Sequence, residues 1–269
     1  MKLNRFFSSQ SVFTHDEFDC FMRKHGSENP NTRKALLAYH KKQGRIISIR
    51  RGLYAVVPIG TSPDSFTVDP FLIAAKMTKD SVLAYHTALE FRGKAHAVFN
   101  RLYYLSKHKT LPLTYQNHKI NQVSIPKKLL LKQGEMRGVE SLQWKGVNVQ
   151  VTTFERTLVD MLDRPELTGS WEEIWRSLQS IEYVDLDQVI EYVRLLGNAT
   201  TAAKVGYFLD KNKDDLLLSN DDLKPLKLLI PNNPHYMVRN NQGGNQKYIK
   251  SWNLVVPEQI HNETWAEEL

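Results

Sequence analysis

Lysine and arginine side chains are concentrated in the first sixty residues of the chain. This segment holds 11 Lys and Arg against 4 Asp and Glu, whereas residues 61–269 hold 25 of each kind. A small domain with unbalanced positive charge has the electrostatics of a phosphate-binding surface. Eight of its residues are our candidates for contacts with double-stranded DNA: Thr32, Arg33, Lys34, Lys41, Lys42, Arg45, Arg50 and Arg51.

Two helices are predicted to position the first of these candidates. Thr14 followed by Glu17 matches a capping box, which predicts a helix that ends at Gly26. A second helix is predicted from Asn31 or Thr32 to Gly44, with leucines and one of Tyr39 or His40 on its core face. That placement directs five residues of the second helix outward: Arg33, Lys34, Ala38, Lys41 and Lys42.

A β-hairpin is predicted directly after these helices. Residues 45–50 and 53–57 are two β-branched runs, and Gly52 between them permits a tight turn with Arg50 and Arg51 at its tip. The order helix, helix, hairpin is that of a winged helix-turn-helix. In such a domain the second helix enters the major groove, and the wing contacts the flanking phosphates.

The rest of the chain predicts a larger mixed domain, so we expect an α+β protein with domains at 1–60 and 61–269. Strands are expected within residues 98–105, 123–125, 139–144 and 147–151, and helices within 70–78, 81–92, 153–162, 170–181, 186–196 and 200–209. The second half is therefore mainly helical. Residues 101–137 hold eight basic residues against Glu135 alone, so this stretch is a candidate auxiliary nucleic-acid surface.

Composition argues against several classes of protein. No apolar run approaches the roughly 20 residues of a membrane span, and no export signal follows the N-terminus, so we expect a cytoplasmic protein without a membrane partner. The single cysteine, Cys20, has no partner for an internal disulfide and is expected to be a buried thiol in the first helix.

The chain shows none of the catalytic, metal-binding or nucleotide-binding motifs that are recognisable in one sequence. We therefore expect no enzyme activity, no cofactor and no metal. His86 with Glu90, and Arg156 with Asp160, have i, i+4 spacing and are interpreted as structural pairs. The acidic residues Asp160 and Asp163 would be the first candidates if the chain were a nuclease.

The strings Lys41–Ile46 and Arg50–Pro58 resemble the N-terminal domain of the AbiEi antitoxins of type IV toxin–antitoxin systems. Residues 82–93, 152–160 and 252–257 are similar to later segments of that family, so the resemblance covers nearly the whole chain. It implies a repressor that binds inverted repeats in the promoter of its own bicistronic operon. It also implies an antitoxin to a nucleotidyltransferase-like toxin encoded beside it, with the antitoxin activity expected in residues 61–269.

Two other functions remain open at this point. The chain fits a stand-alone transcriptional regulator whose large domain senses a ligand or dimerises, and a neighbouring toxin gene would distinguish the two. It also fits a DNA-processing enzyme that is targeted by the N-terminal domain, which predicts metal-dependent cleavage that is lost when the acidic residues are changed.

Overall fold

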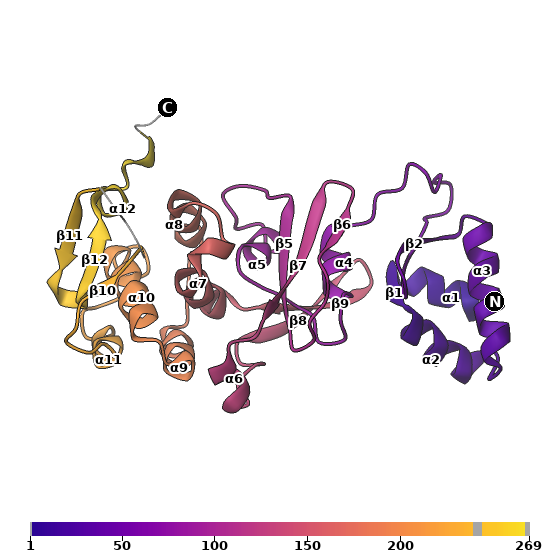
Figure 1. Ribbon diagram of the computed structural model, residues 1–269, viewed down its shortest axis with the longest axis horizontal. Coiled ribbons are helices and arrows are strands. Elements are labelled where there is room, and N and C mark those ends of the chain that lie inside the picture. Colours follow the sequence, from indigo (N-terminus) through magenta and orange to yellow (C-terminus); the bar gives the residue numbers. More distant parts are fainter. Residues whose placement is uncertain (1, 239–243, 267–269) are drawn as a thin grey trace. The chain divides into compact units, whose positions relative to one another are not determined.

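The structure is a computed structural model that describes residues 2–238 and 244–266 (Figure 1). It mixes helices with three β-sheets, which confirms the α+β class. The chain divides into two compact units. The first contains the chain up to Leu83 together with Asn100–Val123 and Ser141–Val151, and the second contains Ala84–Phe99, Ser124–Glu140 and the chain from Thr152 onward. The expected domains at 1–60 and 61–269 stay a prediction.

The N-terminal segment has the predicted helices and hairpin, preceded by one further helix. Its elements are α1 (Lys2–Ser9), β1 (Val12–Thr14), α2 (His15–His25), α3 (Pro30–Lys42), β2 (Ile46–Arg50) and β3 (Leu53–Val56). The three strands form an antiparallel sheet in the order β1-β3-β2. The capping box is confirmed, because the Glu17 amide donates to Thr14 Oγ1 over 3.2 Å and the Thr14 amide donates to Glu17 Oε2 over 2.8 Å.

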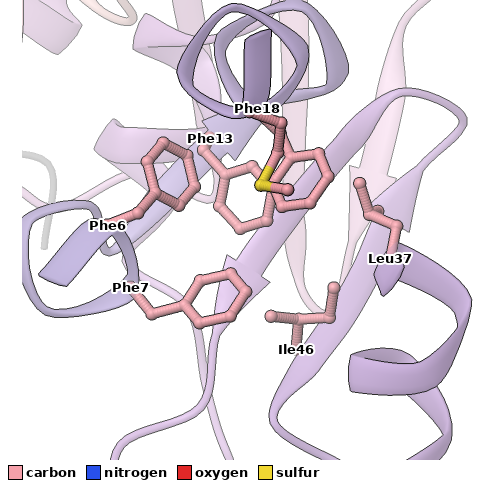
Figure 2. Close-up of a cluster of buried hydrophobic side chains, with 7 residues drawn as sticks. Phe6, Phe7, Phe13, Phe18, Leu37 and Ile46 are labelled. Atoms are coloured by element: carbon pink, nitrogen blue, oxygen red, sulfur yellow. The ribbon is translucent and has the colours of Figure 1, made fainter. Parts of the chain in front are cut away.

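Phenylalanine rings fill the core of this segment. Figure 2 shows Phe6 and Phe7 converging on Phe13 and Phe18, with Leu37 and Ile46 completing the cluster. The Phe6 and Phe13 ring centroids are 5.2 Å apart at 76°, the edge-to-face geometry that aromatic pairs favour. The cluster joins α1, α2, α3 and the hairpin, so the positions of α3 and the hairpin are fixed by one core.

A six-stranded sheet forms the rest of the first unit. Its strand order is β6-β7-β5-β4-β9-β8, with β4 antiparallel to β5 and parallel to β9. The helix before this sheet is α4 (Pro70–Ala75). The strands of the sheet are β4 (Val82–Leu83), β5 (Arg101–Ser106), β6 (Leu113–Tyr115), β7 (His118–Ser124), β8 (Val139–Trp144) and β9 (Val147–Thr152).

The second unit is mainly helical and ends in a small sheet of order β10-β12-β11. Its helices are α5 (His86–Phe91), α6 (Lys127–Leu131), α7 (Phe154–Asp163), η1 (Pro165–Leu167), α8 (Trp171–Gln179), α9 (Leu186–Leu196), α10 (Ala199–Lys211) and α11 (Lys224–Lys227). The C-terminal part adds β10 (His235–Tyr236), β11 (Gln246–Ile249), η2 (Lys250–Trp252), β12 (Leu254–Pro257), α12 (Glu258–Asn262) and η3 (Thr264–Ala266). None of the helices described here combines the length and apolarity that a bilayer crossing requires.

Candidate nucleic-acid interface

A groove of about 600 Å³ lies between α3 and the β2–β3 hairpin. Three of the eight candidate residues line it, namely Lys34 and Lys41 from α3 and Arg51 from the hairpin. The remaining walls are formed by His15, Asp19, Pro30, Asn31, Leu37, Ala38, Ser48, Gly52 and Tyr54. The groove therefore brings together basic side chains from the two elements that sequence assigned to DNA binding.

Helical periodicity explains why α3 presents Lys34 and Lys41 on this side. The helix begins with Pro30 in its first turn, and the side chain of Asn29 accepts a hydrogen bond of 2.9 Å from the Asn31 amide. The three positions of α3 that are buried have i, i+4, i+7 spacing: Arg33, Leu37 and His40. Lys34, Ala38 and Lys41 follow each of them by one residue, so they form an adjacent exposed stripe.

The hairpin tip delivers Arg51 through a backbone turn that requires glycine. Gly52 has a φ of +80°, in the left-handed region that residues with a side chain rarely adopt. Its carbonyl accepts a hydrogen bond of 2.8 Å from the His15 amide, which joins the tip to the start of α2. Arg51 is exposed at this tip, so its guanidinium is available to a ligand in the groove.

Arg33 does not contribute to the groove, and the expectation that it points outward is wrong. Its side chain is buried, with Nε 3.1 Å from Asp19 Oδ1 and Nη1 donating to the carbonyls of Ser27 and Glu28. The helical periodicity of α3 predicts an exposed side chain at residue 33, because arginine is charged and leucines supply the core face. Its guanidinium instead satisfies the turn between α2 and α3, and its stem packs inside.

Other candidate arginines are engaged by their own unit. The Arg50 guanidinium donates to the carbonyl of Met77 through Nη2, so this side chain is directed away from the groove. The Arg45 guanidinium lies 4.8 Å from the centroid of the Phe7 ring, in a cation–π contact. Thr32 and Lys42 are exposed on α3 but do not line the groove.

The one carboxylate on the groove wall is compensated. Asp19 Oδ1 is paired with Arg33, and its Oδ2 lies 3.7 Å from His15 Nε2. Burial lowers the pKa of His40 and the nearby Arg45 lowers it further, which favours the neutral imidazole. The charge that faces a ligand in this groove is thus the positive charge of Lys34, Lys41 and Arg51.

Sequence reasoning did not identify Ser48 and Tyr54 as part of the groove. They are directly opposite each other in the β2–β3 register and are therefore on one face of the hairpin. A two-residue turn at Arg51 and Gly52 pairs Arg50 with Leu53 and would by itself set Ser48 opposite Ala55. The register shifts between Ser48 and Arg50, so the turn signal in the sequence could not have found this pair.

Three comparisons with known proteins bear on this chain. No family model matches it, and no curated protein matches it. Among solved structures, the crystal structure of the RV2827C protein from Mycobacterium tuberculosis is similar to it, with a TM-score of 0.61 and 14% sequence identity. The match covers 98% of this chain and 94% of that one. The likeness shows the fold alone.

The acidic and histidine residues that sequence singled out lie elsewhere, and they are engaged in packing. His86 is fully buried, with Nδ1 3.4 Å from Glu90 Oε2 and Nε2 2.9 Å from Glu173 Oε1. Arg156 Nε lies 3.2 Å from Asp160 Oδ2, which confirms the predicted ion pair. Among the residues that the structure describes, no three His, Cys, Asp or Glu side chains are grouped so as to hold a metal ion.

Proposed function

We propose that this chain is a cytoplasmic double-stranded DNA-binding protein whose first sixty residues form a winged helix-turn-helix. The order of α1, β1, α2, α3, β2 and β3 and the sheet order β1-β3-β2 support this assignment. In it, α3 is the recognition helix and the β2–β3 hairpin is the wing. The observation that carries the proposal is the groove in which Lys34, Lys41 and Arg51 converge.

The arrangement suits duplex DNA because each element meets a different part of it. A major groove about 12 Å wide admits a helix, so Lys34 and Lys41 would contact base edges or the phosphates along it. The wing tip would then bring Arg51 to a flanking phosphate or to the adjacent minor groove. Thr32 and Lys42, also exposed on α3, are further positions for phosphate contacts.

We further propose that the protein represses its own operon by binding promoter inverted repeats, and that it is the antitoxin of a type IV toxin–antitoxin pair. This step is supported by the resemblance of residues 41–58, 82–93, 152–160 and 252–257 to the AbiEi antitoxins. In this account the part of the chain after residue 60 neutralises a nucleotidyltransferase-like toxin.

A binding role is preferred to DNA cleavage because the acidic side chains that a nuclease would use are engaged. Asp160 accepts from Arg156 and, over 2.8 Å, from the Tyr192 hydroxyl. Asp163 accepts a hydrogen bond of 2.8 Å from Asn198 Nδ2, and Glu155 accepts one of 3.1 Å from the Asp185 amide. These contacts leave the carboxylates committed to packing rather than to a metal ion.

A reporter gene placed under the chain's own upstream region tests the proposal in cells. Wild-type protein is expected to repress the reporter. The triple change Lys34→Ala, Lys41→Ala and Arg51→Ala is expected to restore expression of the reporter. Lys250→Ala is the matched control, because Lys250 is exposed in the second unit. Equal repression by the triple variant and the wild type would reject the groove as the DNA-binding surface.

A further inference from the structure

We propose that Asn31 is the residue of α3 that reads a base of the DNA site, and that this base is an adenine. The assignment rests on the proposed function and deepens it, because it gives separate roles to side chains that line the same groove. Lys34, Lys41 and Arg51 hold one sugar–phosphate strand, and Asn31 distinguishes the base pair beside that strand.

The three buried residues of α3 define which of its side chains point farthest outward. In a helix with about 100° per residue, Asn31 and Ala35 lie within roughly 30° of the direction opposite these buried residues. Lys34 and Lys41 lie roughly 90–110° from that direction. Both lysines line the groove, so they point towards the side of the helix that faces the hairpin. The outermost side of α3 therefore carries an amide, and the lysines flank it.

The flanking position of the two lysines suits the phosphate backbone. A helix in the major groove has base edges in front of it and a sugar–phosphate strand on each side. The strand that separates the major from the adjacent minor groove then lies between α3 and the wing tip, where Lys34, Lys41 and Arg51 converge. Three cations from two elements match the regular negative charge of that strand. Contacts of this kind position the protein but select no sequence.

Asn31 lies at the border between the groove and the outermost side of the helix. It follows Pro30 in the first turn of α3, and N-terminal residues of a recognition helix are those that contact base edges. Its side chain is exposed, and the described residues hold no hydrogen-bond partner for its carboxamide. The side chain of Asn29, by contrast, accepts a hydrogen bond of 2.9 Å from the Asn31 backbone amide. One asparagine thus completes the helix start, and the other faces the ligand.

Small neighbours allow Asn31 to come close to the bases. Ala35 follows it by one turn and Ala38 by two, and both are exposed. Asparagine is short, so its carboxamide reaches a base edge only where no longer side chain beside it holds the helix away. Lys42 points in the same direction, but it lies about 16 Å further along the axis, at the other end of the helix.

The carboxamide of Asn31 determines which base it selects. In the major groove adenine presents the N7 acceptor next to the N6 donor. Asn31 Nδ2 can donate to N7 while its Oδ1 accepts from N6, which is the bidentate pair that asparagine makes with adenine. Guanine presents two acceptors there, N7 and O6, so it leaves the side-chain oxygen of Asn31 without a donor.

Titrations of the full chain test this assignment. The probes are the footprinted upstream duplex and a panel in which each base pair of the protected region is changed in turn. The wild type is expected to lose affinity about tenfold or more when one particular A·T pair is changed. Asn31→Ala is expected to bind the parent duplex as weakly as the wild type binds that changed duplex, and to distinguish the two no longer. Replacing this adenine with 7-deazaadenine, which lacks the N7 acceptor, should weaken binding by the wild type but not by Asn31→Ala.

Three further variants separate base reading from other effects. Lys34→Ala is expected to weaken binding to all duplexes by the same factor and to keep the preference for adenine. Asn31→Asp should shift the preference at that position towards cytosine, because a carboxylate accepts from cytosine N4. Asn232→Ala is the matched control for the loss of an asparagine, since Asn232 is exposed in the second unit, and it is expected to bind as wild type.

The assignment is overturned if Asn31→Ala keeps the wild-type preference at every position or weakens binding to all duplexes equally. It is also overturned if Lys34→Ala, and not Asn31→Ala, loses the preference at one position, because base reading would then belong to Lys34. A wild type that binds the upstream and scrambled duplexes equally would instead contradict the proposed function itself, so the two failures are distinguished.

Discussion

Arg33 and Lys34 are adjacent basic residues of α3, yet the structure gives them opposite environments. Arg33 is buried and paired with Asp19, whereas Lys34 is exposed in the groove. The sequence pattern identified the basic helix but not this difference, because a charged residue in a helical pattern is expected to be exposed to solvent. Whether a guanidinium is satisfied inside depends on the carbonyls of Ser27 and Glu28, which are brought near only by the turn between α2 and α3.

Arg33→Ala is therefore expected to act on stability. The change removes hydrogen bonds made by a charged group, each worth about 1.5–3 kcal/mol, so the free energy of unfolding should fall by at least about that amount. Lys34→Ala should change it by less than about 0.5 kcal/mol. Urea denaturation followed by circular dichroism measures both. Unchanged stability of Arg33→Ala with weakened DNA binding would return Arg33 to the set of DNA contacts.

Arg50 and Arg51 provide a second matched pair. The logarithm of the DNA-binding constant falls linearly with the logarithm of the salt concentration. Arg51→Ala is expected to make this slope shallower by about 0.9 for each phosphate contact that is lost. Arg50→Ala should leave this slope unchanged, because the Arg50 guanidinium donates to the Met77 carbonyl. Duplex titrations over a range of salt concentrations give the slopes. Equal reductions in both variants would show that Arg50 also reaches the phosphates.

At the scale of elements, local signals predicted the helices and the hairpin of the N-terminal segment well. The capping box at Thr14 and the Gly52 turn are both present, because each depends on residues close together in the sequence. The expected helix over residues 81–92 is instead β4 followed by α5, interrupted by Tyr85 with a φ of +57°. Its apolar run fits a buried strand as well as a helix, and tertiary pairing with β5 and β9 decides between them.

The small C-terminal sheet was not predicted. Its strand β10 has only two residues, and it pairs in parallel with β12, where His235 lies opposite Leu254, nineteen positions later in the sequence. Such short strands carry almost no alternation to read.

Cys20, expected to be buried, is exposed on α2. The helix buries Phe18 and Met22, and Cys20 lies between them on the opposite side.

Gly52 gives the test of the hairpin. Gly52→Ala is expected to cost about 1–2 kcal/mol of stability, since φ is +80° even though no atom lies within 4 Å of the added Cβ. Gly52→Asn should cost less, because asparagine tolerates this backbone conformation. Thermal unfolding of both variants measures the difference. Equal losses for Ala and Asn would mean that the side chain, and not the backbone, is the cause.

At the scale of the whole molecule, two histidines predict how stability depends on pH. Burial, followed by nearby positive charge, lowers the pKa of His40 and of His261 from the ordinary value of 6.5. The folded state therefore binds these protons more weakly than the unfolded state does. Their contribution to stability is complete above pH 6.5 and is lost as the pH falls below that value towards the folded-state pKa values.

His40→Gln removes one of these groups, so this variant should lose less stability than the wild type between about pH 7.5 and about pH 5.5. Urea denaturation of both proteins at the two pH values measures the difference. A wild-type loss that is no larger than that of the variant would contradict a buried, neutral His40.

The α+β class was predictable at this scale, because composition and hydrophobic periodicity are properties of the whole chain. The division into units was not, because residues 100–123 and 141–151 join the N-terminal unit through strand pairing with β4. Sequence likewise supplied the basic candidates, and the structure shows that Lys34, Lys41 and Arg51 among them line one groove.

The most direct test of the central claim is a titration of the full chain with its own upstream duplex and with a scrambled duplex, at roughly 50 mM and roughly 200 mM salt. The account predicts tighter binding to the upstream region, a footprint over inverted repeats, and a steep loss of affinity for both duplexes at the higher salt. Equal affinity for the two duplexes, or no binding to either, would contradict it.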